Sequence, residues 1–188
     1  MSINLSEDVL DFMSLVRAGD IDLYNEFSFQ HEIGLFLRGR HPRLRVQFER
    51  NVSAFFDSSV GFTKREIDIT VFDAAGALKL ALELKFPRRG QYPEQMFSFC
   101  KDIAFAEELV RAGFEQAAAL VLVDDPCFYR GRAEGIYAPF RSSAYALEGV
   151  IQRPTGDRSG RVELRGRYQV EWRTVLEEMQ YALFHVIG

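Results

Sequence analysis

Three ionisable residues of this 188-residue chain have types and spacing that could support hydrolytic chemistry. Glu83 and Lys85 lie two residues apart in a largely apolar segment, and Asp68 lies in an earlier segment of the same kind. Two carboxylates held close together repel each other, so one pKa rises unless a cation lies between them. Mg²⁺ binds one or two carboxylates together with water and substrate phosphate, and a neighbouring lysine could orient water or stabilise charge on a phosphate oxygen. These residue types therefore favour metal-assisted hydrolysis of a phosphodiester.

The alternation of apolar and polar residues predicts how the three side chains meet. Residues 65–72 and 79–86 each alternate with period two, which is typical of two strands joined by a short turn. A turn centred midway between them places Asp68 opposite Glu83, and opposed residues have Cβ atoms about 4.5–5.5 Å apart. Glu83 and Lys85 share one face of their strand because side chains two residues apart point the same way. The opposite, apolar face of the first strand is expected to carry Ile67, Ile69 and Val71.

The rest of the chain supplies elements that could cover this hairpin. The sequence predicts helices over about residues 6–18, 28–38 and 93–112, with Ser6 as the first N-cap, and further strands over about 44–48 and 117–123. Towards the C-terminus we expect strands at 149–153, 161–172 and 180–187, with a loop or short helix at 136–143. This order predicts an α/β fold with a central mixed sheet flanked by helices and with additional C-terminal strands.

Two further polar residues are candidates for the same site. Glu32 has mostly apolar neighbours at helical spacing, so its carboxylate is expected to lean towards the buried side, where it needs a partner or a metal. A structural ion pair with an arginine would explain Glu32 equally well. Gln95 lies in the first turn of the helix after Lys85, where it could bind water or phosphate, or simply face solvent.

The charge distribution is uneven although the net charge is only −4, from 23 basic and 27 acidic residues. This balance excludes a protein that coats nucleic acid by bulk charge. Five arginines between residues 38 and 50, and a second basic cluster around Lys85, nevertheless suit a polyanion bound at one place, or else a solvated surface. The candidates for phosphate contacts are Arg43, Arg45, Arg88 and Arg89.

Several other classes of protein are excluded by sequence patterns. The longest apolar run spans seven residues, 117–123, whereas a membrane-spanning helix needs about 20. The acidic N-terminal segment has no signal-peptide character, and Cys100 and Cys127 suit reduced thiols, so we expect a cytoplasmic protein. The chain lacks glycine-rich phosphate-binding loops, the serine-hydrolase elbow and the paired-histidine zinc motif.

Together, these residues resemble the PD-(D/E)XK nuclease superfamily, whose fold is called restriction-endonuclease-like. The resemblance is carried by Glu32 on an early helix, by Asp68, by the Glu83-Leu84-Lys85 triplet and by the helix–three strands–helix–strand order over residues 28–123. One departure is that Ile67, rather than a proline, precedes Asp68.

The resemblance implies roles for these residues. Asp68, Glu83 and the Leu84 carbonyl would bind Mg²⁺ or Mn²⁺, Lys85 would position or activate the attacking water, and Glu32 would assist at the metal. Gln95 matches a polar helix position that many members carry after the triplet.

The expected protein is therefore a metal-dependent endonuclease, a hydrolase that binds and cuts DNA. Residues 1–188 would form a single nuclease-like domain, with its core at about 28–124 and a C-terminal elaboration at about 126–188. A homodimer would account for a double-strand cut. One alternative is a catalytically silent nuclease-like fold that binds DNA or protein, and another is a purely structural cluster of buried ions.

Overall fold

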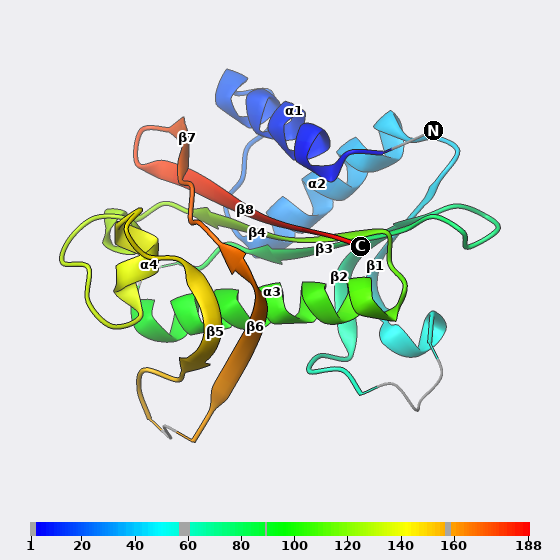
Figure 1. Cartoon of the computed structure of the whole chain (residues 1–188). Helices are drawn as coiled ribbons and strands as arrows, with labels where there is room; N and C mark the ends of the chain where they lie inside the picture. Colours follow the sequence, from blue (N-terminus) through cyan, green and yellow to red (C-terminus); the bar gives the residue numbers. More distant parts are fainter. Residues whose placement is uncertain (1–2, 57–60, 89, 157–158) are drawn as a thin grey trace.

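The computed structural model describes residues 3–56, 61–88, 90–156 and 159–188 and has an α/β architecture (Figure 1). Its main sheet is mixed and has six strands in the order β1-β2-β3-β4-β8-β7, and β5 pairs with β6 in a second, small sheet. The helices are α1 (Leu5–Ala18), α2 (Glu26–Arg40), α3 (Tyr92–Ala112) and α4 (Tyr137–Arg141). The strands are β1 (Arg45–Asn51), β2 (Glu66–Phe72), β3 (Lys79–Lys85), β4 (Gln116–Val123), β5 (Leu147–Gln152), β6 (Arg161–Tyr168), β7 (Arg173–Leu176) and β8 (Met179–Ile187).

Most of the predicted elements are present, with two corrections at their ends. The first helix is capped by Asn4, whose side chain accepts a hydrogen bond from the Ser6 amide, so the prediction of Ser6 as the cap was wrong. The strand expected over 161–172 ends at Tyr168, and β7 follows it as a separate strand. None of the described helices is long and apolar enough to cross a membrane.

The β2–β3 hairpin has the predicted register. Val71 pairs with Leu80 and Ile69 with Leu82 in antiparallel orientation, which is the alignment that places Asp68 opposite Glu83. β3 then runs parallel to β4, and α3 makes the crossover between them. A parallel pair requires such a crossover, so α3 must lie across the face of the sheet next to β3.

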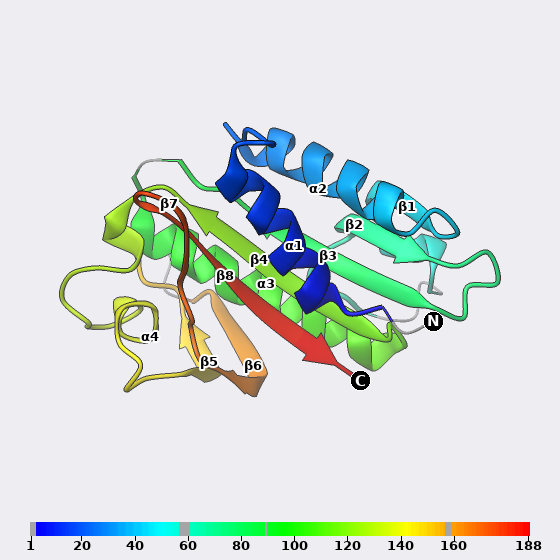
Figure 2. The ribbon, with the colours of Figure 1, turned by 90° about the horizontal axis from the view of Figure 1, so that it is seen from above.

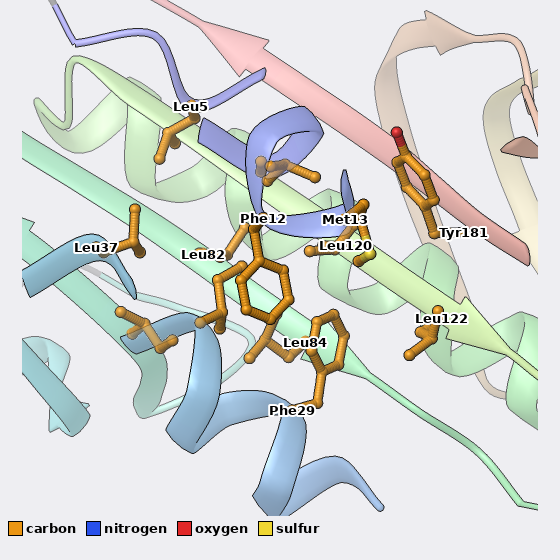
Figure 3. Packing of buried hydrophobic residues seen from close by; sticks show 14 of the residues in the cluster. Leu5, Phe12, Met13, Phe29, Leu37, Leu82, Leu84, Leu120, Leu122 and Tyr181 are labelled. Atoms are coloured by element: carbon orange, nitrogen blue, oxygen red, sulfur yellow. The ribbon is translucent and has the colours of Figure 1, made fainter. Parts of the chain in front are cut away.

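Helices cover both faces of the main sheet. α1 and α2 lie on one face and α3 on the other, where the β5–β6 pair also lies (Figure 2). Beneath α1 and α2, Phe12 and Phe29 stack with ring centroids 6.1 Å apart above Leu82 and Leu84 of β3 (Figure 3). Apolar burial of this kind, at about 25 cal/mol per Å², provides the main driving force for docking the helices on the sheet.

One apolar residue of β2 departs from the expected face. Ile69 and Val71 belong to the core beneath α1 and α2, but Ile67 packs in a separate cluster with Ala81 of β3 and Phe105 of α3. The expectation of a single face for all three residues was therefore wrong at Ile67. The strand therefore changes the face on which its apolar side chains lie at Asp68, next to the last regular pair of β2 with β3, Ile69–Leu82.

A buried carboxylate fastens the second sheet to α3. Glu107 of α3 accepts hydrogen bonds from the backbone amides of Arg165 and Gly166 and from the Tyr168 hydroxyl, at 2.7–3.1 Å. Burial of the Tyr168 ring, together with this hydrogen bond to Glu107, raises the pKa of the tyrosine. The hydroxyl therefore stays protonated and remains a donor to the carboxylate.

We predict that Glu107→Gln lowers the free energy of unfolding by about 1–3 kcal/mol. The amides of Arg165 and Gly166 and the Tyr168 hydroxyl would then donate to a neutral amide oxygen, which is a weaker acceptor than a carboxylate. Urea denaturation would measure this change. Glu163→Gln, an exposed position on β6, is the control and should change stability by less than about 0.5 kcal/mol. Equal stability of the two variants would show that Glu107 does not secure the second sheet.

Candidate functional site

Asp68 and Glu83 meet where the β2–β3 pairing ends. Beyond the Ile69–Leu82 pair, hydrogen bonds from backbone amides to side-chain carboxylates take the place of the backbone–backbone hydrogen bonds. The Asp68 carboxylate accepts a hydrogen bond of 2.7 Å from the Leu84 amide, and the Glu83 carboxylate accepts one of 3.3 Å from the Asp68 amide. The two strands thus hold the two carboxylates in fixed positions next to each other.

Lys64 and Asp102 complete the buried side of this arrangement. Lys64 precedes β2, and its Nζ forms an ion pair with Glu83 Oε2 and lies 3.0 Å from Asp102 Oδ1 of α3. The side chains of Glu83 and Asp102 are only 1% and 4% exposed, whereas that of Lys64 is 29% exposed. A partly exposed ammonium therefore pairs with two buried acids.

Lys85 lies at the end of β3 among three acceptors. Its Nζ donates a hydrogen bond of 3.0 Å to the Leu84 carbonyl and lies 3.5 Å from Asp102 Oδ2 and 3.7 Å from Glu26 Oε1. Glu26 is the first residue of α2, and its other oxygen accepts a hydrogen bond from the Phe86 amide at 2.8 Å. The six residues Glu26, Lys64, Asp68, Glu83, Lys85 and Asp102 are called the ionic cluster below.

Burial and mutual repulsion shift the titration of the cluster. Burial, and then the neighbouring Asp68, raise the pKa of Glu83 despite the attraction of Lys64. Burial likewise raises the pKa of Asp68. Burial by itself would lower the pKa of both lysines, but the surrounding carboxylates outweigh it and raise the pKa of each. Lys64 and Lys85 are therefore ammonium ions at neutral pH.

Helix α2 also fixes the backbone at Asp68. Gln30 Nε2 donates a hydrogen bond of 3.0 Å to the Asp68 carbonyl, and the same group binds the Glu49 carboxylate of β1. The Gln30 side chain therefore connects α2 to β2 at Asp68, one of the two candidate metal-binding carboxylates.

Two predicted residues lie apart from the ionic cluster. Glu32 Oε1 lies 3.3 Å from His31 Nδ1 and the Glu32 side chain is 36% exposed, so this carboxylate is partly buried and pairs with a histidine rather than with the cluster. Gln95 is partly buried in the first turn of α3, seven residues before Asp102, which corresponds to about 10 Å along a helix. The ion pairs within the cluster, as far as the chain is described, involve neither residue.

The candidate phosphate-binding arginines have different environments. Arg43 and Arg45 are exposed before and at the start of β1. Arg88 forms an ion pair of 3.0 Å with Asp124 and lies over the Phe86 ring, close in sequence to Lys85. Arg89 lies outside the described residues.

Three members of the ionic cluster were not assigned to the site from the sequence. Asp102 carried a signal, because it is a charged residue on a helix and three of its four neighbours at helical spacing, Phe99, Phe105 and Ala106, are apolar. Glu26 and Lys64 carried none, because each lies outside the strands of the hairpin and reaches the cluster only through the packing of its element.

The arrangement has no preformed metal site within the described part of the chain: no three or more His, Cys, Asp and Glu side chains are grouped so that they could hold an ion. Instead, the Lys64 ammonium lies between the carboxylates of Glu83 and Asp102. All the ligands that the cluster offers are oxygens, which are the ligands that Mg²⁺ prefers.

A hollow elsewhere on the surface has a different character. It has a volume of about 680 Å³ and lies beside β5, lined by residues between 135 and 154. None of these lining residues belongs to the ionic cluster, so the hollow is not part of the candidate site.

Comparisons with family models, with curated proteins and with solved structures gave no match. The functional argument therefore depends on the residues and geometry of the ionic cluster.

Proposed function

We propose that the protein hydrolyses phosphodiester bonds of nucleic acid, specifically DNA, with a divalent metal ion, and that its fold is restriction-endonuclease-like. The observation that carries this proposal is the pair of carboxylates at the end of the β2–β3 ladder, with Lys85 two residues beyond Glu83. The order α2, β1, β2, β3, α3, β4 supports the α-β-β-β-α-β core of the PD-(D/E)XK nucleases.

The chemistry of the ligands fits Mg²⁺ or Mn²⁺. Asp68, Glu83 and the Leu84 carbonyl would hold the ion, since all three belong to the end of the β2–β3 hairpin and offer oxygen ligands. Burial and the proximity of Asp68 raise the pKa of Glu83, so a cation beside it would be strongly stabilising. A bound ion would supply a water of lowered pKa and would neutralise charge on the phosphate.

Lys85 would act as a cation in this site. Its contacts with the Leu84 carbonyl, Asp102 and Glu26 hold the ammonium in place and keep it protonated. A fixed ammonium can orient the attacking water and stabilise the negative charge that develops on a phosphate oxygen. Asp102 would be a positioning residue, because it acts through Lys85.

The exposed arginines would hold the substrate. Arg88 lies three residues beyond Lys85, and Arg43 and Arg45 are exposed at the start of β1. Contacts from such residues to phosphates position a nucleic acid without reading its sequence. Binding through these residues should therefore weaken as the salt concentration rises.

A second candidate function is favoured by Lys64. This ammonium pairs with both Glu83 and Asp102, as a counter-ion in a catalytically silent fold would. Such a protein would bind DNA or another protein. It would show salt-dependent binding that survives replacement of Asp68 and no metal-dependent cleavage.

Cleavage of supercoiled plasmid and single-stranded DNA with Mg²⁺, Mn²⁺ or EDTA tests the proposal. The wild-type protein should cut only with a metal, and Lys85→Ala should lower the rate about 100-fold, because it removes a fixed charge at the reacting phosphate. Lys79→Ala at the start of β3, where the ammonium lies over the Phe56 ring, is the control and should cut like wild type. Metal-independent cutting, or full activity of Lys85→Ala, would refute the proposed site.

A further inference from the structure

Lys64 is the least enclosed cation partner of the buried acids. Its Nζ contacts the carboxylates of Glu83 and Asp102, and the Lys64 side chain is 29% exposed. Lys85, in contrast, is 19% exposed and also donates to a backbone carbonyl. Of the two lysines, Lys64 has the more exposed side chain and both of its ion-pair partners are side chains, so its ammonium can leave without breaking a hydrogen bond to the backbone.

We infer that Lys64 is a displaceable internal counter-ion that occupies the cation position beside Glu83, so that a divalent metal ion binds there only when the Lys64 ammonium moves away. The inference rests on the proposed role of Asp68 and Glu83 as metal ligands. It explains why the acids of the ionic cluster do not form a ready metal site in the described chain, although their chemistry suits one.

The charges of the ionic cluster support this competition. It contains four carboxylates and two ammonium groups, and Lys64 is in contact with Oε2 of Glu83. Two cations cannot share that oxygen at close range without strong repulsion in a poorly solvated site. A divalent ion would replace the single positive charge of Lys64 with two and would satisfy the same buried acids.

The local structure allows the ammonium to move while the backbone stays in place. The preceding residue, Thr63, donates hydrogen bonds from its amide and hydroxyl to Glu108 of α3, at 2.8 and 3.0 Å. Lys64 itself has a flexible four-carbon stem and a strongly hydrated head group. Its side chain can therefore swing into solvent while Thr63 keeps the segment attached to α3.

The opposing interpretation is that Lys64 is a permanent structural counter-ion. Removing one partner of a buried ion pair is then simply destabilising, because it leaves an uncompensated charge. The two interpretations differ in one respect: a displaceable counter-ion can be replaced by a metal, whereas a permanent one cannot.

Calorimetric titration with MnCl₂ and melting curves with MnCl₂ or EDTA separate these interpretations. We expect Lys64→Met to bind Mn²⁺ at least about tenfold more tightly than wild type, because close charge pairs couple by at least that factor. Its melting temperature should fall in EDTA and recover with Mn²⁺. Lys64→Arg, which keeps the charge, and the control Lys79→Met should both bind Mn²⁺ like wild type.

Unchanged Mn²⁺ affinity in Lys64→Met, or a lowered melting temperature that Mn²⁺ does not restore, would overturn the inference. If Lys64→Met does not fold, NMR of wild-type protein with ¹³Cε-labelled lysine gives the answer. Addition of MgCl₂ should then shift the Lys64 signal and leave that of Lys79 in place. A Lys64 signal that MgCl₂ does not move would overturn the inference.

These measurements are independent of the cleavage assay. Tighter Mn²⁺ binding by Lys64→Met without any cleavage by wild type would support the counter-ion role and refute the nuclease. Cleavage by wild type, together with unchanged Mn²⁺ affinity in Lys64→Met, would support the nuclease and refute the counter-ion role.

Discussion

Replacing Asp68 by asparagine should lower the rate of metal-dependent DNA cleavage about a thousandfold or more while leaving the fold intact. The asparagine oxygen can still accept the hydrogen bond that Asp68 Oδ2 receives from the Leu84 amide at 2.7 Å, so the end of the hairpin keeps its geometry. The substitution removes the negative charge that would hold the ion, and metal assistance amounts to several kcal/mol of transition-state stabilisation. Plasmid nicking rates, measured over a range of Mg²⁺ concentrations, give the size of the effect.

Asp73→Asn is a matched control for this experiment. Asp73 lies in the turn of the same hairpin, and its side chain accepts a hydrogen bond of 3.1 Å from the Leu78 amide, which asparagine can also accept. This variant loses one carboxylate at a distance from the ionic cluster and should cut DNA like wild type. If both variants cut equally well, Asp68 is not a metal ligand.

The metal-free protein should lose stability as the pH rises from about 4.5 to about 8. Burial, and then repulsion from Asp68, raise the pKa of Glu83 from its ordinary 4.5 to about 8 in the folded protein. Between these values the folded state binds more protons than the unfolded state, so the free energy of unfolding falls with increasing pH, by up to about 1.4 kcal/mol per unit. The charged groups that face Glu83 are Lys64, Asp68 and Asp102. Burial also raises the pKa of Asp68, so this residue changes the stability in the same direction.

Urea denaturation in EDTA at a series of pH values tests this dependence. Glu83→Gln should flatten the slope, because the amide carries no proton to lose, and should make the protein more stable than wild type at pH 8. Glu163→Gln on β6 controls for the loss of a carboxylate at an exposed position. A wild-type stability that rises across this range would contradict the predicted titration.

The hairpin was the most predictable part of the molecule because its information is local. Alternation with period two predicted the faces of β3 and of β2 from Ile69 onwards, and a short turn fixed which residues oppose each other. The pairs from Ile69–Leu82 to Phe72–Lys79 follow the register expected from the sequence. The long helix α3 and the apolar strand β4 were predictable for the same reason, since each is a long segment with one clear pattern.

The partners of the hairpin residues were much less predictable. The sequence pointed to Glu32 as the carboxylate that α2 contributes, but Glu26, six residues earlier, contacts Lys85 instead. Helical spacing shows which face of a helix is apolar, but it does not show where the helix begins relative to the sheet. The position of Glu26 depends on how α2 docks over β3, which involves contacts between distant parts of the chain.

By itself, the sequence determined the α/β class, the order of elements along residues 28–123 and the alignment of Asp68 with Glu83. Tertiary structure alone decided that the regular ladder ends just before this pair, that Lys64 pairs with Glu83, and that Asp102 of α3 contacts both lysines. The physical reason is the range of the interactions. Strand and helix periodicity act over a few residues, whereas a buried charge takes whichever counter-charge the packing of remote elements brings within reach.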